Sequence, residues 1–497
     1  MIKILLLLLT SMMAFNVAGV SVAPLTGCES FKDDLPVQAG GRVKPYYVLA
    51  KDSVKFLTGK SKYNKENPSL TICKLTLAQK EDASFPILVE HIQTKELIGL
   101  KAGDTYINSP ELMAKNMLIR SEYFKQKENN SFKKDLSKLL MRMKVFTEII
   151  EGTTFTVFAD NKWQPFNNFK NKSPEEVKNL ISSSKTSFIK AHGDDYLLEL
   201  TYVKSHIFSY ALLVVLLAIF LTVLFKQLKY GVIAAAIVIL VELTGLVMRV
   251  MISGRAPITN MYETVLFSGF GCLIISLGVL YFKRDKIFLI AGLGYNMLCL
   301  FMMMFANNML NSSISPLVPV LRDNFWLSTH VTTIILSYAA LALSWLVANI
   351  TLFKMRLGKL SQKDYRYYQG LIYTCIKVGI VLLATGIILG GVWADYSWGR
   401  FWGWDPKETW SLIVLLFYVA VVHGRYSNWI NTHRFVMLSA AGFMTVMMAW
   451  FGVNYILAAG LHSYGFSEGG AIFLGTFFLI QITFLVICSI KNKFKEN

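Results

Sequence analysis

The stretch HIFSYALLVVLLAIFLTVLFK, residues 206–226, begins a series of apolar runs that continues almost to the end of the chain. A helix of about 20 apolar residues can cross the hydrocarbon core of a bilayer, which is about 30 Å thick. Nine such runs can be read, at about 206–226, 231–251, 262–282, 287–306, 331–353, 371–392, 409–425, 435–457 and 472–490. The sequence therefore predicts an all-α polytopic membrane protein with about nine transmembrane helices.

The N-terminal residues differ in composition from these runs. The leader MIKILLLLLTSMMAFNVAG has a lysine, an apolar stretch and then small residues, which is typical of a secretory signal. Residues 29–200 are polar and rich in lysine. We therefore predict a signal peptide or N-terminal anchor at 1–28, an exported, extracytoplasmic region of mixed α/β structure at 29–204, a multi-span membrane domain at 205–491 and a cytoplasmic tail at 492–497.

Cysteine usage narrows the function. The chain has six cysteines and neither a CxxC nor a CxxCH motif, so it is neither a c-type cytochrome nor a thioredoxin-like reductant. Cys28 and Cys73 could form a disulfide. The preceding Leu25-Thr26-Gly27 resembles a lipoprotein box, however, and a lipid on Cys28 would prevent that bond; Ser21-Val22-Ala23 is a competing cleavage site. The other four cysteines lie in apolar runs and are predicted to be buried.

Charge indicates the orientation of the chain in the membrane. The 497 residues are 54% hydrophobic, with a mean hydropathy of +0.45, which is too apolar for a soluble protein. The net charge of +18 is not accompanied by a nucleic-acid recognition motif, so we expect no nucleic-acid partner. If residues 29–200 lie outside, the inner loops carry fifteen lysines and arginines and the outer loops four. The positive-inside rule then predicts a multi-pass protein of the cytoplasmic membrane with its C-terminus inside.

One predicted outer loop is unusually rich in tryptophan. The stretch WADYSWGRFWGWDPKETWSL, residues 393–412, holds five of the ten tryptophans of the chain, namely Trp393, Trp398, Trp402, Trp404 and Trp410. Tryptophan collects at membrane interfaces, which is the ordinary explanation. Here Asp405 and Pro406 also supply a helix N-cap and a proline at the first helical position, and Glu408 an acidic first turn. Such shaping favours a platform for a large, flat, apolar ligand.

Three histidines accompany this loop. His330 and His462 are predicted on loops of the same membrane side as the tryptophans, whereas His423 falls at the inner end of the seventh run. A single histidine at a helix end is most often an interface residue. Imidazole is, however, the commonest nitrogen ligand of transition metals, haem iron included. A porphyrin is the common cofactor that needs both flat aromatic walls and two axial imidazoles.

These motifs resemble a known family. WGRFWGWDPKETW is similar to the WWD signature of haem-handling membrane proteins, and specifically to the CcsA (ResC) component of the System II cytochrome c synthase. Further stretches similar to this family occur in the family's order: NMYETVLF at 260–267, WLSTHVTTIILSYAALA at 326–342, AVVHGR at 420–425 and GVNYILAAGLHSYGF at 452–466.

The resemblance implies a role in cytochrome c biogenesis. A protein of this kind receives haem b across the membrane and presents it outside for thioether attachment to the CxxCH motifs of apocytochrome c. His330 and His462 would ligate the haem iron and, with Asp405, form the catalytic group. Trp393, Trp398, Trp402, Trp404 and Trp410 would bind the porphyrin in the WWD loop at 393–410, and His423 would ligate iron at an inner delivery site.

The same resemblance implies partners. The family's second component, a CcsB/ResB-like membrane subunit, has no counterpart in this chain, so holocytochrome c synthase (haem lyase) activity would require it as a separate subunit. A thioredoxin-like thiol reductant would keep the substrate cysteines reduced, and membrane lipid would surround the spans. Two alternatives are a haem-handling protein of the System I type and a membrane cytochrome b subunit for electron transfer.

A charged pair is also expected inside the membrane. Glu242 lies within the second run, where a carboxylate is costly unless it is paired. Arg249 is two helical turns away on the same face. The sequence therefore predicts that these two residues form an ion pair.

Overall fold

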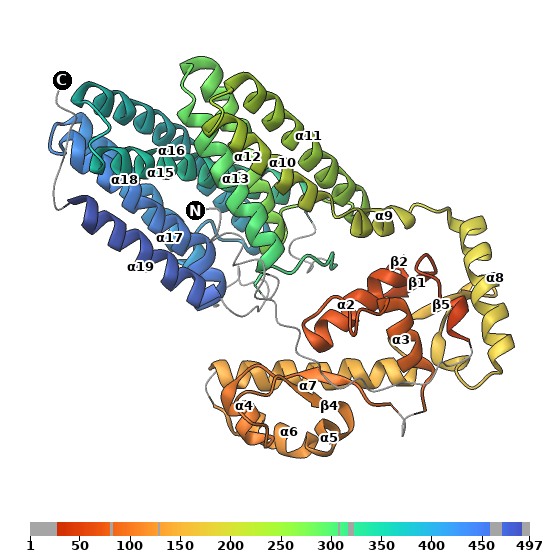
Figure 1. Cartoon of the computed structure of the whole chain (residues 1–497). Helices are drawn as coiled ribbons and strands as arrows, with labels where there is room; N and C mark the ends of the chain where they lie inside the picture. The colour runs from red at the N-terminus through yellow and green to blue at the C-terminus, as the bar shows by residue number, and fades with distance from the viewer. Residues whose placement is uncertain are drawn as a thin grey trace. The chain divides into compact units, whose positions relative to one another are not determined.

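The computed structural model describes residues 27–79, 83–127, 130–306, 309–316, 323–457 and 470–489. The chain forms two compact units, Met1–Val203 and Lys204–Asn497 (Figure 1). Each unit has its own hydrophobic core among the described residues.

The first unit contains two small antiparallel sheets. One has the strand order β2-β1-β5-β6 and the other pairs β3 with β4. The bounds are β1 Pro36–Ala39, β2 Arg42–Pro45, β3 Pro86–Leu88, β4 Tyr106–Asn108, β5 Thr156–Ala159 and β6 Lys162–Pro165. The β1–β2 and β5–β6 hairpins turn at Gly40-Gly41 and Asp160-Asn161, all four with positive φ, as tight two-residue hairpin turns require.

Helices make up most of the rest of this unit. They are η1 Cys28–Ser30, α2 Tyr46–Thr58, α3 Pro68–Leu77, α4 Ile92–Leu97, α5 Ser109–Ala114, α6 Asn116–Lys125, α7 Ser131–Glu151, η2 Phe166–Asn168 and α8 Pro174–His192. The long α7 buries Leu136, Leu139, Met143, Phe146 and Ile150, which recur every three or four residues and form one face. The predicted mixed α/β structure of the N-terminal region is thereby confirmed.

A disulfide closes one loop of this unit. Cys28 of η1 is bonded to Cys73 of α3, with their Cα atoms 5.7 Å apart. The bond uses the sulfur that lipidation would require, so the structure favours the disulfide over a lipid on Cys28. The cysteines predicted to be buried, Cys272, Cys299, Cys375 and Cys488, are all buried and free.

The second unit is a helical bundle. Nine helices in the described part of the chain are long and apolar enough to cross a membrane, which confirms the predicted number. The first begins as α9 Leu197–Ser205, most of which belongs to the first unit, and continues as α10 Ile207–Val223. The others are α11 Leu228–Ser253, α12 Met261–Lys283, α13 Ile287–Phe305, α14 Asn324–Trp326 continued by the π-helix η4 Leu327–Val331 and by α15 Thr332–Arg356, α16 Gln362–Trp398, α17 Pro406–Tyr426, α18 Thr432–Met447 continued by the π-helix η5 Met448–Leu457, and α19 Gly470–Ser489.

Helix α15 lies at the centre of this bundle. It packs against α12, α13, α16 and α18 (Figure 1) and is buried along most of its length. The close approach of α16 to α15 depends on small residues. At Gly379 of α16, for example, an added Cβ would lie 2.6 Å from a methyl carbon of Leu341 in α15. The bundle thus holds the start of α15 and the end of α16 side by side.

The predicted pair of Glu242 with Arg249 is wrong. The Asn296 amide of α13 donates to both carboxylate oxygens of Glu242, at 2.9 and 3.1 Å. Nε of Arg249 instead donates to Oε1 of Glu263 in α12 at 2.7 Å. Two turns separate Glu242 and Arg249 by about 10 Å along one helix. Each side chain therefore finds its partner on a neighbouring helix.

Candidate functional site

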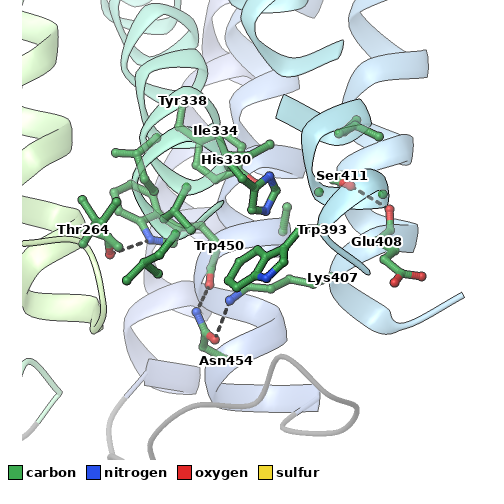
Figure 2. A pocket seen from close by; sticks show the side chains of 18 of the residues that line it. Thr264, His330, Ile334, Tyr338, Trp393, Lys407, Glu408, Ser411, Trp450 and Asn454 are labelled. Atoms are coloured by element: carbon green, nitrogen blue, oxygen red, sulfur yellow. Dashed lines mark hydrogen bonds between the residues drawn. The ribbon is translucent and has the colours of Figure 1, made fainter. Parts of the chain in front are cut away.

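A pocket opens between the helices around the start of α15 and the end of α16 (Figure 2). Its walls come from α12, η4, α15, α16, α17 and η5, and from the loops before α12 and between α16 and α17. The aromatic residues that line it are Tyr338, Trp393, Trp398, Phe401, Trp402 and Trp450. The polar residues include Thr264, His330, Lys407, Glu408, Ser411 and Asn454. The pocket is thus mainly aromatic and apolar, with a few polar groups at defined points.

His330 is held by a hydrogen bond to a backbone carbonyl. Its Nδ1 lies 2.8 Å from the carbonyl oxygen of Gly386 in α16. A carbonyl can only accept, so Nδ1 carries the proton and donates it. In the neutral ring the lone pair then lies on Nε2. A hydrogen bond of this kind is how proteins commonly orient a metal-binding imidazole.

Local backbone geometry places this ring in the pocket. His330 was predicted on a loop, but it lies in the π-helix η4, which continues into α15. A π-helical turn adds a residue to the helix and often occurs at functional sites. The second π-helix, η5, lines the same pocket through Trp450 and Asn454. Both interruptions of regular α-helix therefore face one cavity.

The predicted tryptophan loop is partly helical, because α16 extends to Trp398. Trp393 is thus a helical residue, 5% exposed, and its ring meets that of His330 edge-on at a centroid distance of 5.9 Å. Trp398 and Trp402 also line the pocket. The structure therefore brings three of the five predicted tryptophans together with His330.

The other two tryptophans lie elsewhere. Trp404 does not line the pocket: it has a positive φ of 56° and is 69% exposed. Its ring stands at a right angle to that of Trp402, with the centroids 5.9 Å apart. Trp410, in the second turn of α17, packs against the core of the bundle. Neither residue belongs to the pocket wall.

The turn before α17 is fixed by a capping box, and the predicted N-cap is confirmed. The Asp405 side chain accepts the Lys407 N–H at 2.9 Å, and Glu408 accepts the N–H groups of Gly403 and Asp405 at 2.8 and 3.1 Å. Asp405 is 6% exposed and does not line the pocket. Its contribution in this structure is to hold the tryptophan-bearing loop.

The structure does not bring His423 to this pocket. It lies in the last turn of α17, exposed, with its ring edge-on to Trp429 at 5.9 Å. Eighteen residues separate it from Asp405 at the opposite end of the helix, or about 27 Å at 1.5 Å per residue. His462 lies outside the described residues.

Several pocket residues were not predicted. Trp450 donates through Nε1 to the hydroxyl of Thr264 at 3.2 Å, and Asn454 accepts from Lys407 Nζ at 3.2 Å. Trp450 and Asn454 are four residues apart, the spacing of neighbours on one helix face. Asn454 lies inside the GVNYILAAGLHSYGF motif at 452–466 and Trp450 lies two residues before that motif, so this spacing is the signal that could have identified them.

The chain resembles known proteins over this part of its length. Residues 258–462 match the family model described as "Cytochrome C assembly protein", and they include every residue that lines the pocket. A "Cytochrome c biogenesis protein CcsA" of Prochlorococcus marinus (strain MIT 9312) is 35% identical over 296 residues, which are 53% of this chain and 94% of that protein. The protein of the same name from Guillardia theta is 33% identical, over 51% of this chain and 93% of that protein.

A longer protein also matches. "Protein NrfI" of Wolinella succinogenes is 36% identical over 227 residues, which are 44% of this chain but only 24% of NrfI. The similarity thus extends to a protein in which the matched region is a small part of the whole.

Proposed function

Because the chain belongs to the CcsA family of cytochrome c biogenesis proteins, we propose that the pocket around His330 binds haem and presents it to apocytochrome c. Membership of this haem-handling family and the nine apolar helices found in the described residues already establish a multi-pass membrane protein of cytochrome c biogenesis. The proposal adds the site, the ligands and the reaction.

The hydrogen bond from His330 Nδ1 to Gly386 carries the proposal. It assigns the lone pair of the neutral imidazole to Nε2, the nitrogen that axial ligation requires. The surrounding Trp393, Trp398 and Trp402 offer flat apolar surfaces to a macrocycle. Each aromatic contact would contribute about 1 kcal/mol beyond the area it buries.

The supply of ligands favours haem over a bare metal ion. Among the described residues, no group of three or more His, Cys, Asp or Glu side chains could hold a metal. A transition-metal ion outside a cofactor needs about three or four protein ligands. Iron in a porphyrin already has four nitrogens and needs only axial ligands. One imidazole in an aromatic pocket therefore fits haem, and His462 would supply the second axial ligand.

The proposed reaction needs no nucleophile from this chain. Each cysteine thiol of a CxxCH segment adds across a haem vinyl group: its sulfur bonds to one vinyl carbon and a proton reaches the other, with no net oxidation. The chain would contribute orientation and exclusion of water, which can lower a barrier by several kcal/mol. The substrate's own histidine would replace one axial imidazole and so release the product. Asp405 would act indirectly: as the N-cap of α17 it would hold the tryptophan-bearing loop in place.

Partners follow from what the reaction requires. The substrate thiols must be reduced, and the four free cysteines in the described part of the chain are all buried, so a separate thioredoxin-like reductant is needed. We further propose a CcsB/ResB-like subunit that completes the synthase, with His423 at an inner haem-delivery site. The pocket would face the outside of the cytoplasmic membrane. The 35% identity to a CcsA protein favours this System II assignment over a System I protein or a cytochrome b.

The test is to purify the chain from haem-replete cells, with and without a ResB-like subunit. Absorption spectra and haem quantification should give a Soret band and close to one haem per complex. A colourless complex from such cells would refute haem binding.

A further inference from the structure

We propose that Lys407 and the indole N–H of Trp393 bind a carboxylate of the ligand in this pocket, and that this carboxylate is a haem propionate. The proposal rests on the proposed function, because it names the part of haem that Lys407 and Trp393 would recognise. It makes Lys407 a positioning residue, since it would fix how the porphyrin is turned within the pocket.

Lys407 is the only lysine or arginine among the described residues that line the pocket. Its ammonium group has three donors and donates to Asn454 Oδ1 at 3.2 Å. In the view of Figure 2, its side chain extends from α17 to Asn454, with the indole of Trp393 drawn between it and the imidazole of His330. The cation and the proposed iron ligand thus line the same cavity.

The neighbouring carboxylates are committed to the backbone. Glu408 accepts the N–H groups of Gly403 and Asp405, and Asp405 accepts the backbone N–H of Lys407. The charge of Asp405, two residues away, acts on Lys407, but no carboxylate in the described part of the chain forms a salt bridge with it. A lysine without a salt bridge in a largely apolar pocket favours an anionic ligand.

Lys407 also occupies an unfavourable position in its helix. It is the second residue of α17, where the helix dipole favours acidic residues and disfavours a cation. Departures from such local rules tend to occur at functional sites. An anion bound here would interact favourably with both the lysine and the N-terminal end of α17.

Trp393 supplies an independent observation. The residue is 5% exposed, it lines the pocket, and its buried Nε1–H has no hydrogen-bond partner among the described residues. The indole nitrogen can only donate. A buried donor left without an acceptor is unfavourable, and a ligand that accepts from it removes that cost. A carboxylate in the pocket would accept from this N–H and from Lys407 together.

Haem has the matching chemistry. Its two propionates leave one edge of the porphyrin, and its two vinyl groups lie on the rings away from that edge. Binding a propionate at Lys407 would therefore turn the vinyl groups away from this wall and leave them accessible to substrate thiols. A pocket that held haem by stacking and axial ligation alone would not distinguish these orientations.

The test compares haem with haem dimethyl ester, in which both propionates are neutral. Full-length protein, prepared free of haem in detergent, is titrated with each compound and followed by its Soret absorption. Wild type should bind the ester about tenfold more weakly than haem, since a charge-assisted hydrogen bond is lost. Lys407→Met should bind haem about tenfold more weakly and the ester unchanged. The preference for haem over its ester should fall less in Trp393→Phe than in Lys407→Met. Lys407→Arg should retain most of this preference.

Lys363→Met is the matched control, because this exposed lysine lies in the first turn of α16, away from the pocket. It should keep the full preference for haem. If wild type binds both compounds equally, or if Lys407→Met weakens both equally, the propionate assignment is overturned while haem binding stands. If wild type binds neither compound, the proposed function itself fails.

Discussion

The imidazole of His330 lies against the backbone of Gly390, one helical turn after Gly386, whose carbonyl oxygen accepts the hydrogen bond from His330 Nδ1. A Cβ added at position 390 would lie 2.6 Å from Cε1 and 3.0 Å from Nδ1 of the ring. Real Cβ atoms do not approach other atoms as closely as 2.6 Å, so any side chain at 390 must move the ring. The position of the proposed iron ligand thus depends on the absence of a side chain in α16.

We expect Gly390→Ala to displace His330 and to lower haem content by about tenfold or more, because shifts of about 1 Å at a reacting group have large effects. Haem per protein and the Soret maximum are the measurements. Gly370→Ala is the control, since it lies in the same helix with nothing within 4 Å of the added Cβ. Normal haem loading in Gly390→Ala would show that ring placement is unimportant.

The number of spans could be predicted because a bilayer requires long apolar helices whatever their packing. The residues at which these helices begin and end could not be predicted. The sixth run was predicted at 371–392, but α16 extends from Gln362 to Trp398. A helix continues through polar residues wherever its backbone hydrogen bonds are satisfied, as they are between the cap at Ser361 and the glycine at 399.

The site was predicted only in part, for a similar reason. The tryptophans and His330 were found because their local patterns are unusual. Gly390 has no unusual local pattern, and its importance comes from its contact with His330. Lys407 is unusual only as a cation in the first turn of α17, and its proposed importance comes from its contact with Asn454 on another helix. Such contacts between distant segments, like the Arg249–Glu263 pair, are set by tertiary packing and cannot be read from spacing along one helix.

The second prediction concerns that buried pair. Arg249 is fully buried and Glu263 is 1% exposed. Glu263→Gln would leave the guanidinium without its counter-charge, at a cost of about 3 kcal/mol. Glu242→Gln should cost less than about 1 kcal/mol, because an amide oxygen can still accept from Asn296. Thermal unfolding in detergent should rank the two variants in this order, and the reverse order would contradict the assigned pairing.

The third prediction concerns the disulfide. Cys73→Ser should destabilise the N-terminal unit by about 2–4 kcal/mol, the usual contribution of a native disulfide. Reductant should lower the unfolding temperature of wild type but not that of the variant. Mass spectrometry of wild type should find an unlipidated Cys28 joined to Cys73. A lipid on Cys28 would contradict the structure at this point.

The fourth prediction concerns orientation. Ser397 and Lys363 are exposed near opposite ends of α16, whose 37 residues span about 55 Å. If the pocket faces outward, an impermeant thiol reagent added to intact cells should label Ser397→Cys and not Lys363→Cys. The free native cysteines in the described chain are buried and should give little background. Labelling of position 363 alone would invert the proposed topology.

The fifth prediction tests iron ligation directly. His330→Gly would remove one axial ligand and leave a space about the size of an imidazole ring, while stacking on the tryptophans would keep part of the affinity for haem. We expect a partial loss of haem in His330→Gly and in His462→Gly, and a nearly complete loss when both are changed. Added imidazole should enter the vacant position and restore haem binding and cytochrome c synthesis.

Rescue by imidazole separates ligation from a merely structural effect of the substitution. A glycine within η4 destabilises the helix by about 1 kcal/mol, but this cost is the same with and without imidazole. The difference between the two conditions therefore reports the vacant ligand position alone. His192→Gly is the control: this exposed histidine ends α8 in the N-terminal unit, so imidazole should change nothing. If His330→Gly assembles cytochrome c at the wild-type rate without imidazole, His330 does not ligate the iron, and the Gly386 hydrogen bond has only a structural role.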